Sequence, residues 1–460
     1  MTARILFVFL FILVAVACSA LASPLAPSPT VSPQQHIIFH NGIILTMDAT
    51  APQAEAIEIT GEKMTAVGSN EKILALARAE TMVVDLDGRT LMPGFVDAHT
   101  HLFNDAEQYF NMSLEEVQQV ALANGITTLG DLYIDERLLK EMQAFAPALR
   151  IRTNLYLVMT DNCGKVLGDW YKEYPVTRHP GEMLHIGGVK LFSDGGTCER
   201  PALSYELRPG EGLGDLFHTQ EELNEMVLAA QTAGYQIAIH AIGDRAVEQA
   251  QNAIAYALDG QPNSFRHRID HNSVIGPDLL PRYGEIGIIP VVSGLYPHCN
   301  PFGPPPPSAY QAWEWPARAL LEANPGLPVA WHGDDPFFGR VRPLDDLHSF
   351  ITRNDVDAEG NVCPAPDWHQ AHTITVADAL PMMTINAAYA LFRDEEVGSL
   401  EVGKYADLIV LPDNPLTAAP EALVEMDVLL TMVGGRVEFC APAHADLCLS
   451  FPGENGTAVP

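Results

Sequence analysis

Pro93-Gly94-Phe95-Val96-Asp97-Ala98-His99-Thr100-His101 has the pattern of a buried β-strand that ends in polar side chains. Residues two apart in an extended chain point the same way, so His99 and His101 share a face. Two imidazoles on one face form a chelating pair for a metal ion. A lone His-x-His pair is weak evidence, and its weight depends on the strands that follow it in the chain.

Alternating strand and helix patterns fill the middle of the chain. The helix pattern over 113–124, for example, has Ser113 as its N-cap and Glu116 three residues later, which is the arrangement of a capping box. The candidate strands lie at 93–99, 126–132, 151–158, 186–193, 235–241, 266–271, 286–292 and 328–333. Eight such strand–helix units over about 300 residues predict an α/β fold, a (β/α)8 TIM barrel over residues 93–395.

Both ends of the chain have a different pattern, that of short strands joined by turns. Residues 36–92 contain apolar strands around a turn at Asn41-Gly42, and residues 396–440 repeat this pattern around Gly434-Gly435. We therefore predict one small β-sandwich that is assembled from both chain ends, followed by a C-terminal tail at 441–460.

Polar residues end several of the predicted barrel strands, and the active sites of such barrels lie at those ends. Strand five ends at His240, strand six at His271 and strand eight at Asp334. Strand four carries Lys190 between apolar residues, and burying a lysine charge is costly. One explanation is carboxylation by CO2, which makes the lysine an anionic bridge between two metal ions. The other is a neutral or ion-paired lysine with a structural role.

These residues resemble the amidohydrolase superfamily of metal-dependent hydrolases. Besides 93–101, the segments 189–195, 239–246 and 267–271 are similar to the branch that includes the N-substituted formamide deformylases. The C-terminal segment 398–411 is similar to the return of that superfamily's chain into its small sandwich. The resemblance extends over residues 36–440, and its motifs occur in the order expected for the family.

Strand eight departs from the family pattern. The family usually has Gly-Ser-Asp-x-Pro at this position, whereas this chain has Gly333-Asp334-Asp335-Pro336. Counting back from Pro336 selects Asp334 as the functional aspartate. His332 and Asp335 are then unusual neighbours of this residue, and they are expected to reshape the pocket.

The resemblance implies two divalent metal ions, expected to be zinc, with manganese, iron and nickel as open alternatives. It implies that His99 and His101 hold one ion, that His240 and His271 hold the other, and that carboxylated Lys190 bridges them. The full set of implied metal ligands is His99, His101, Lys190, His240, His271 and Asp334. Asp194 and Arg200, on the loop after strand four, are candidate substrate contacts, or else they stabilise that loop through a salt bridge.

The implied reaction is hydrolysis of a carbon–nitrogen bond in a non-peptide amide, an N-acyl compound or a formamide. A metal-activated hydroxide would attack the carbonyl carbon, while Asp334 accepts the proton and passes it to the leaving nitrogen. Two alternatives remain open. One is ester or lactone hydrolysis at the same site, and the other is a non-catalytic extracellular binding protein on a hydrolase scaffold.

The charge of the chain restricts its partners. The 460 residues include 58 acidic and 26 basic side chains, which give a net charge of -32. A negative field of this size repels nucleic acid and disfavours adsorption to anionic lipid surfaces. A small-molecule substrate is therefore the expected partner.

The N-terminus resembles an export signal. Arg4 precedes an apolar run over 5–17, which suits the core of a signal peptide and is short for a membrane span. Ala20-Leu21-Ala22 offers a cleavage site, so we predict a signal peptide at 1–22 and a Ser/Pro-rich tether at 23–35. The alternatives are a lipid anchor at Cys18 and an uncleaved anchoring helix. We expect an exported protein that is secreted, periplasmic or lipid-anchored at the cell surface.

Export permits disulfide bonds. Cys440 and Cys448 are close in sequence and follow the last predicted strand, so we predict a disulfide between them. The scattered cysteines show no C-x-x-C spacing, and we expect them to be ordinary buried or loop thiols rather than metal ligands. These residues are Cys163, Cys198, Cys299 and Cys363.

Overall fold

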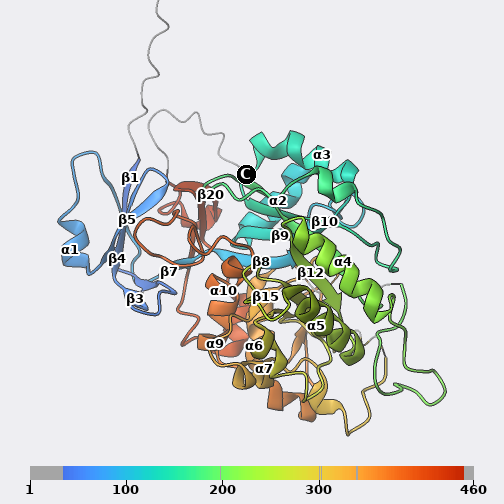
Figure 1. The fold of residues 1–460 in the computed structure, drawn as a ribbon. Coiled ribbons are helices and arrows are strands. Elements are labelled where there is room, and N and C mark those ends of the chain that lie inside the picture. The colour runs from blue at the N-terminus through green and yellow to red at the C-terminus, as the bar shows by residue number, and fades with distance from the viewer. Residues whose placement is uncertain (1–34, 197, 300, 302, 338–339, 450–460) are drawn as a thin grey trace, which may run out of the picture. The chain divides into compact units, whose positions relative to one another are not determined.

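The computed structural model describes residues 35–196, 198–299, 301, 303–337 and 340–449 (Figure 1). The predicted signal peptide, the alternative lipid anchor at Cys18 and nearly all of the tether lie outside the described residues. Within the described part of the chain, no helix has the length and apolar character needed to cross a bilayer.

A parallel sheet of eight strands forms the centre of the molecule, and its strands are adjacent in chain order. These strands are β8 (Phe95–Thr100), β9 (Ile126–Ile134), β10 (Arg152–Val158), β11 (Leu184–Phe192), β12 (Gln236–Ala241), β13 (Arg268–His271), β14 (Ile289–Ser293) and β15 (Ala330–His332). Two backbone hydrogen bonds join the segment after β15 to β8. Asp334 N–H donates to His99 O at 3.0 Å, and His101 N–H donates to Asp335 O at 2.9 Å. The predicted α/β TIM barrel is confirmed.

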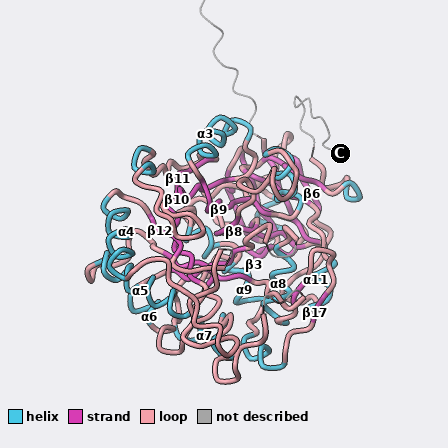
Figure 2. The backbone as a smooth tube through the Cα atoms, turned by 90° about the vertical axis from the view of Figure 1, so that its right-hand side faces the viewer, coloured by secondary structure: helices cyan, strands magenta, loops and turns pink. Residues whose placement is uncertain are grey.

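Helices surround this barrel (Figure 2). They are α2 (Leu114–Ala123), α3 (Glu136–Phe145), α4 (Gln220–Thr232), α5 (Asp244–Leu258), α6 (Arg282–Ile286), α7 (Ala317–Ala323), α8 (Pro343–Thr352) and α9 (Val376–Met382). Helix α2 begins at the predicted capping box, in which Ser113 accepts from the backbone of Glu116 and the Glu116 carboxylate accepts from that of Ser113. Such boxes satisfy backbone N–H groups that a helix start leaves unpaired.

Helix α10 (Ile385–Ala390) closes the end of the barrel opposite the polar strand ends. Its small residues Ala387 and Ala388 pack against the barrel interior, in one cluster with Ala98 and Tyr156. Gln236, at the start of β12, donates to the carbonyl oxygen of Ala390 at 2.9 Å. The polar strand ends lie away from this helix, at the carboxyl ends of the barrel strands.

A β-sandwich is built from both ends of the chain. Its first sheet has the order β5 (Lys63–Gly68), β4 (Ala56–Thr60), β1 (His36–His40) and β6 (Met82–Asp85). Its second sheet has the order β20 (Arg436–Cys440), β19 (Leu430–Val433), β18 (Leu408–Leu411), β7 (Thr90–Pro93), β2 (Ile43–Leu45) and β3 (Gln53–Ala54). Strand β18 pairs antiparallel with β7, so the predicted composite sandwich is confirmed. Helices α1 (Asn70–Leu74) and α11 (Pro420–Glu425) and the hairpin of β16 (Asp355–Val356) and β17 (Val362–Cys363) complete the described strands and α-helices.

One buried ion pair connects the barrel to the sandwich. Arg152 at the start of β10 donates from Nε to Asp407 Oδ2 at 2.7 Å and from Nη2 to Oδ1 at 3.1 Å. Asp407 Oδ1 also accepts from the backbone N–H of Gly434 at 2.8 Å. The two side chains are almost fully buried, at 2% and 1% exposed. A two-pronged Arg–Asp contact of this kind fixes orientation as well as distance.

Three disulfides occur in the described chain. The predicted bond between Cys440 and Cys448 is confirmed. The expectation of free thiols for the other four cysteines is wrong, because the remaining disulfides are Cys163–Cys198 and Cys299–Cys363. The partners are 35 and 64 residues apart, so sequence spacing gives no sign of them. In each pair, two loops at the carboxyl end of the barrel meet and bring the Cα atoms to 5.3 Å.

Candidate metal centre

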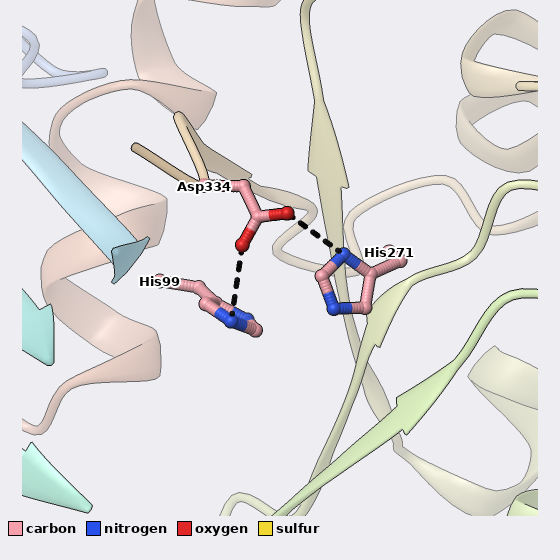
Figure 3. Close-up of side chains that lie close together, drawn as sticks. All are labelled: His99, His271 and Asp334. Carbon is pink, nitrogen blue, oxygen red and sulfur yellow. Dashed lines mark ion pairs between the residues drawn. The ribbon is translucent and has the colours of Figure 1, made fainter. Parts of the chain in front are cut away.

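The residues that end the barrel strands converge on one buried cluster. His99 belongs to β8 and His101 follows it, His271 ends β13, and Asp334 comes two residues after the end of β15. Figure 3 shows the Asp334 carboxylate between the rings of His99 and His271. One ligand atom from each of these three residues lies within 4.8 Å of the other two.

The carboxylate of Asp334 is the centre of this cluster. Its Oδ1 lies 3.4 Å from Nε2 of His99 and 3.4 Å from Nε2 of His101. Its Oδ2 lies 3.8 Å from Nδ1 of His271. The Nε2 atoms of His99 and His101 are themselves 3.3 Å apart, so the predicted chelating pair shares a face.

The backbone at the cluster adopts uncommon conformations. His271 has a φ of 76° and Asp334 a φ of 57°, in the left-handed region that few residues other than glycine adopt. Gly333 precedes Asp334, and a Cβ there would lie 2.8 Å from Asp335 Oδ2 and 3.0 Å from Asp97 Oδ2. A side chain at 333 would therefore have to displace one of these carboxylates. The left-handed backbone at His271 and Asp334 is strain of a kind that is typical of functional sites.

Lys190 and His240 extend the cluster from β11 and β12. Lys190 Nζ lies 3.4 Å from His99 Nε2 and 3.6 Å from Asp270 Oδ2. Burial lowers the pKa of Lys190 to about 8, although Asp270 and Asp334 oppose the shift. The ring of His240 lies 4.4 Å from that of His271, and its Nε2 donates to the carbonyl oxygen of Gly195 at 3.2 Å.

His99, His240 and His271 are in the form that binds metals. Burial lowers the pKa of His240 to about 3, and it moves the pKa values of His99 and His271 well below 6.5. Neutral imidazole offers one lone pair to a cation. His271 Nε2 and Asp334 Oδ1 are buried and have no hydrogen-bond partner within the described chain. Neutral imidazoles, a carboxylate and these unsatisfied atoms fit a divalent metal ion.

His332 and Asp335 adjoin the cluster, as their sequence position suggested. The ring centroid of His332 lies 5.2 Å from that of His99 and 5.0 Å from that of His271. Neither ring nitrogen of His332 has a hydrogen-bond partner among the described residues. Burial raises the pKa of Asp335 well above 3.8, and the nearby carboxylate of Asp97 adds to this effect.

Sequence reasoning gave no role to Arg268 and Asp270, which lie in the barrel interior beside the cluster. Asp270 Oδ2 accepts from His99 Nδ1 at 2.8 Å. Arg268 donates two hydrogen bonds to the Asp270 carboxylate, at 2.7 and 3.0 Å. Burial acts to raise the pKa of Asp270, but Arg268 and Lys190 hold it below its ordinary value. The available signal was their alternation in β13, which puts residues 268 and 270 on one face.

Asp194 and Arg200 do not join the cluster as a pair. Asp194 is fully buried, and its oxygens accept from the backbone N–H groups of Ala202, Ile242 and Gly243 at 2.9 to 3.0 Å. Its carboxylate thus connects two loops, and its Oδ1 lies 3.8 Å from Nε2 of His240. The Arg200 side chain is 52% exposed and pairs with Glu211 at 3.5 Å. The geometry favours the loop-stabilising role over substrate contact for both residues, although no Asp194–Arg200 salt bridge forms.

The fold and the cluster agree with a comparison against protein families. The model of the amidohydrolase family matches residues 82–131 and 121–439, which is most of the chain. The chain therefore belongs to the amidohydrolase family.

The sequence identity of this chain to individual relatives is low. The chain is 28% identical to Protein LONG AFTER FAR-RED 3 of Arabidopsis thaliana over 353 residues, which are 70% of this chain and 56% of that protein. It is 28% identical to the N-substituted formamide deformylase of Arthrobacter pascens over 270 residues, 56% of this chain and 46% of that protein. The chain thus spans about half the length of these curated relatives. A solved structure of an uncharacterized metal-dependent hydrolase from Pyrococcus furiosus shares the fold, with a TM-score of 0.68 and 19% identity over 83% of this chain and all of that one.

Proposed function

We propose that this protein is a metal-dependent hydrolase that cleaves a carbon–nitrogen bond in a small molecule, of the non-peptide amide, N-acyl or formamide type. One observation carries the proposal, namely the Asp334 carboxylate held 3.4 Å from His99 and His101 and 3.8 Å from His271. Membership of the amidohydrolase family and the likeness to a formamide deformylase support it.

Two divalent cations, with zinc the best match to the ligand chemistry, would be held by this cluster. His99 and His101 would bind one, His240 and His271 the other, with Lys190 between them. Such ions polarise a carbonyl group and lower the pKa of water. The hydrogen bond from His240 Nε2 to Gly195 O supports this assignment, because it leaves the lone pair of Nδ1 available to a cation.

Carboxylation of Lys190 is part of the proposal. The lone pair of the neutral amine forms a bond to the carbon of CO2, and the nitrogen releases one proton. Burial lowers the pKa of Lys190 to about 8, so a substantial fraction of the amine is neutral near physiological pH. The resulting carbamate carries one negative charge, which balances part of the positive charge of two cations.

Asp334 would move the proton. Its carboxylate is buried beside the neutral imidazoles of His99 and His271, and Oδ1 has no hydrogen-bond partner within the described chain, so it is free to accept a proton from the attacking water. The same group would then donate that proton to the leaving nitrogen, which departs as a neutral amine. General base catalysis of this kind contributes about 10²- to 10⁴-fold in rate.

Metal analysis combined with hydrolysis assays tests the proposal. We expect bound metal in the purified protein and amine release from members of an N-acyl and formamide collection. Dipeptides and lactones serve as comparison substrates, together with an amide and an ester that share one acyl group. Faster turnover of the ester and the lactones would favour the ester or lactone hydrolase. Protein that contains no metal and turns over no compound would favour the non-catalytic binding protein.

We also propose that the protein is exported. Three disulfides in the described chain support an oxidising compartment, since such bonds are rare in the cytosol. Mass spectrometry of the protein from its own cells tests this proposal. A mature N-terminus at Ser23 indicates signal-peptide cleavage, and a lipid on Cys18 indicates the anchored form. An intact Met1 would contradict both.

A further inference from the structure

Asp270 is the shared acceptor for three side chains in the interior of the barrel. Its Oδ2 lies 2.8 Å from His99 Nδ1 and 3.6 Å from Lys190 Nζ. Arg268 donates to both of its oxygens, from Nε to Oδ1 at 2.7 Å and from Nη2 to Oδ2 at 3.0 Å. All four side chains are fully buried, so no water competes for these contacts.

The contact with Asp270 determines which nitrogen of His99 carries the hydrogen. A carboxylate only accepts hydrogen bonds, so Nδ1 of His99 must be the N–H donor. Nε2 then keeps its lone pair, and this is the nitrogen that lies 3.3 Å from His101 Nε2 and 3.4 Å from Asp334 Oδ1. Without a fixed acceptor, the two neutral tautomers of His99 would compete, and one of them cannot bind a cation through Nε2.

The contact with Arg268 determines the orientation of the Asp270 carboxylate. Asp270 Oδ2 lies 3.6 Å from Nζ of Lys190, so a rotation of this carboxylate would change its contact with a residue of the proposed metal centre. The two hydrogen bonds from Arg268 fix the orientation of the Asp270 carboxylate plane. Arg268 Nη2 also donates to the carbonyl oxygen of Ala98 at 2.8 Å. Ala98 directly precedes His99 in β8, so the network ties Asp270 to the strand it serves.

We propose that Asp270, locked by Arg268, is the positioning residue of the metal centre. Asp270 orients His99 so that Nε2 faces a cation, and it keeps Lys190 next to His99. Asp270 itself does not become a ligand. The inference rests on the proposed function, because it assumes that a cation binds at His99. Acceptors behind metal-binding histidines typically change metal affinity by about 10- to 100-fold when they are removed.

The chain offers a matched control for this role. Arg152 and Asp407 form a buried pair with the same two-pronged geometry, at 2.7 and 3.1 Å, where the barrel meets the sandwich. Asp270→Asn and Asp407→Asn remove the same charge from similar contacts. In Asp270→Asn the amide has one oxygen for Arg268 and His99, so the His99 tautomer is no longer fixed.

Two measurements test the proposal on the full chain. The first is the affinity of metal-free protein for Co²⁺, followed by visible absorption. We expect a loss of about 10- to 100-fold in Asp270→Asn and less than about 3-fold in Asp407→Asn. The second is a ¹⁵N spectrum of histidine-labelled, metal-free protein, with the His99 signals assigned by their absence in His99→Gln. We expect hydrogen on Nδ1 of His99 in the wild type and in Asp407→Asn, and a mixture of tautomers in Asp270→Asn.

Several results would overturn the inference. Wild-type affinity in Asp270→Asn is one, and an equal loss in Asp407→Asn is another, because the effect would then belong to any broken buried pair. Hydrogen on Nε2 of His99 in the wild type is a third, and this measurement remains decisive if Asp270→Asn fails to fold. If wild-type protein binds no Co²⁺, the proposed function fails, whereas the tautomer measurement still reports on Asp270 alone.

Discussion

Asp334 and His99 are joined twice. The backbone N–H of Asp334 donates to the carbonyl oxygen of His99 at 3.0 Å, and the carboxylate Oδ1 of Asp334 lies 3.4 Å from Nε2 of the same histidine. The first contact closes the barrel between its last and first strands, and the second forms the candidate metal centre. The backbone position after β15 therefore sets the barrel closure and the place of the carboxylate together.

Asp334→Asn should lower the rate of hydrolysis by at least about 10²-fold, because an amide does not accept the proton. The amide oxygen can keep its place near His99 and His101, so at least one metal ion should remain bound. The measurement is kcat on samples whose metal content is determined in parallel.

Asp335→Asn is the control for this substitution. Burial raises the pKa of Asp335 well above 3.8, so burial favours its neutral form, which an amide resembles closely. We expect Asp335→Asn to retain most of its activity. The opposite result, loss in Asp335→Asn and full activity in Asp334→Asn, would mean that the functional aspartate lies one residue later than the count from Pro336 places it.

The barrel and its polar strand ends could be predicted because the signals are local. Each strand is a short apolar run, and residues such as His240 and His271 stand at the end of one. Parallel strands of a barrel bring such ends together whatever their separation in the chain. The same reasoning places Lys190 inside the barrel, since an isolated lysine in an apolar strand needs a buried partner.

Other features depend on contacts across the sheet or between loops, which a single sequence does not reveal. Asp270 accepts from His99, which is 171 residues away, and only the register of β8 against β13 shows it. The position of Asp194 on a loop suggested a substrate contact, but its carboxylate accepts hydrogen bonds from three backbone N–H groups of neighbouring segments. The disulfide between Cys299 and Cys363 needs two long loops to meet, and no spacing rule describes their course.

Lys190→Ala should lower the metal content of the purified protein, because the anion that both cations share would be lost. Lys404→Ala is the matched control. Lys404 is also largely buried, and its Nζ donates to Ser399 Oγ at 2.5 Å. Elemental analysis per folded chain provides the measurement, and ¹³C spectra of protein grown with labelled bicarbonate should show a carbamate signal in the wild type and in Lys404→Ala but not in Lys190→Ala. Unchanged metal in Lys190→Ala, His240→Ala and His271→Ala would refute the two-metal assignment.

The disulfides should differ in their contribution to stability. In the chain-entropy model, closing the 64-residue loop of Cys299–Cys363 contributes about 4 kcal/mol, and closing the 8-residue loop of Cys440–Cys448 about 2–3 kcal/mol. Double serine variants of each pair, compared by urea unfolding, should show the larger loss for the longer loop. Peptide mapping without reductant checks the pairings first. A larger loss for Cys440–Cys448 would contradict the entropic account.

His267 should make the stability of the protein depend on pH. Its Nδ1 accepts from the backbone N–H of Ile237 at 3.1 Å, and its Nε2 donates to Gln231 at 2.9 Å, so the folded protein holds it neutral. Burial lowers its pKa to about 3 from the 6.5 of an exposed histidine. Below pH 6.5 the unfolded chain binds a proton that the folded chain does not, so stability falls as the pH drops from 6.5 towards 3.

His267→Gln removes the group that binds this proton in the unfolded chain. One proton contributes at most about 1.4 kcal/mol per pH unit to the slope of unfolding free energy against pH. As the pH drops, the free energy of unfolding should therefore fall less steeply in the variant than in the wild type, by up to that amount per pH unit. Urea unfolding of metal-free protein at several pH values between about 6 and about 4 measures both slopes. Comparing slopes rather than absolute values separates proton binding from any packing loss that glutamine causes. Parallel curves for the two proteins would show that His267 takes up its proton in the folded state, and that the hydrogen bonds to Ile237 and Gln231 do not hold it neutral.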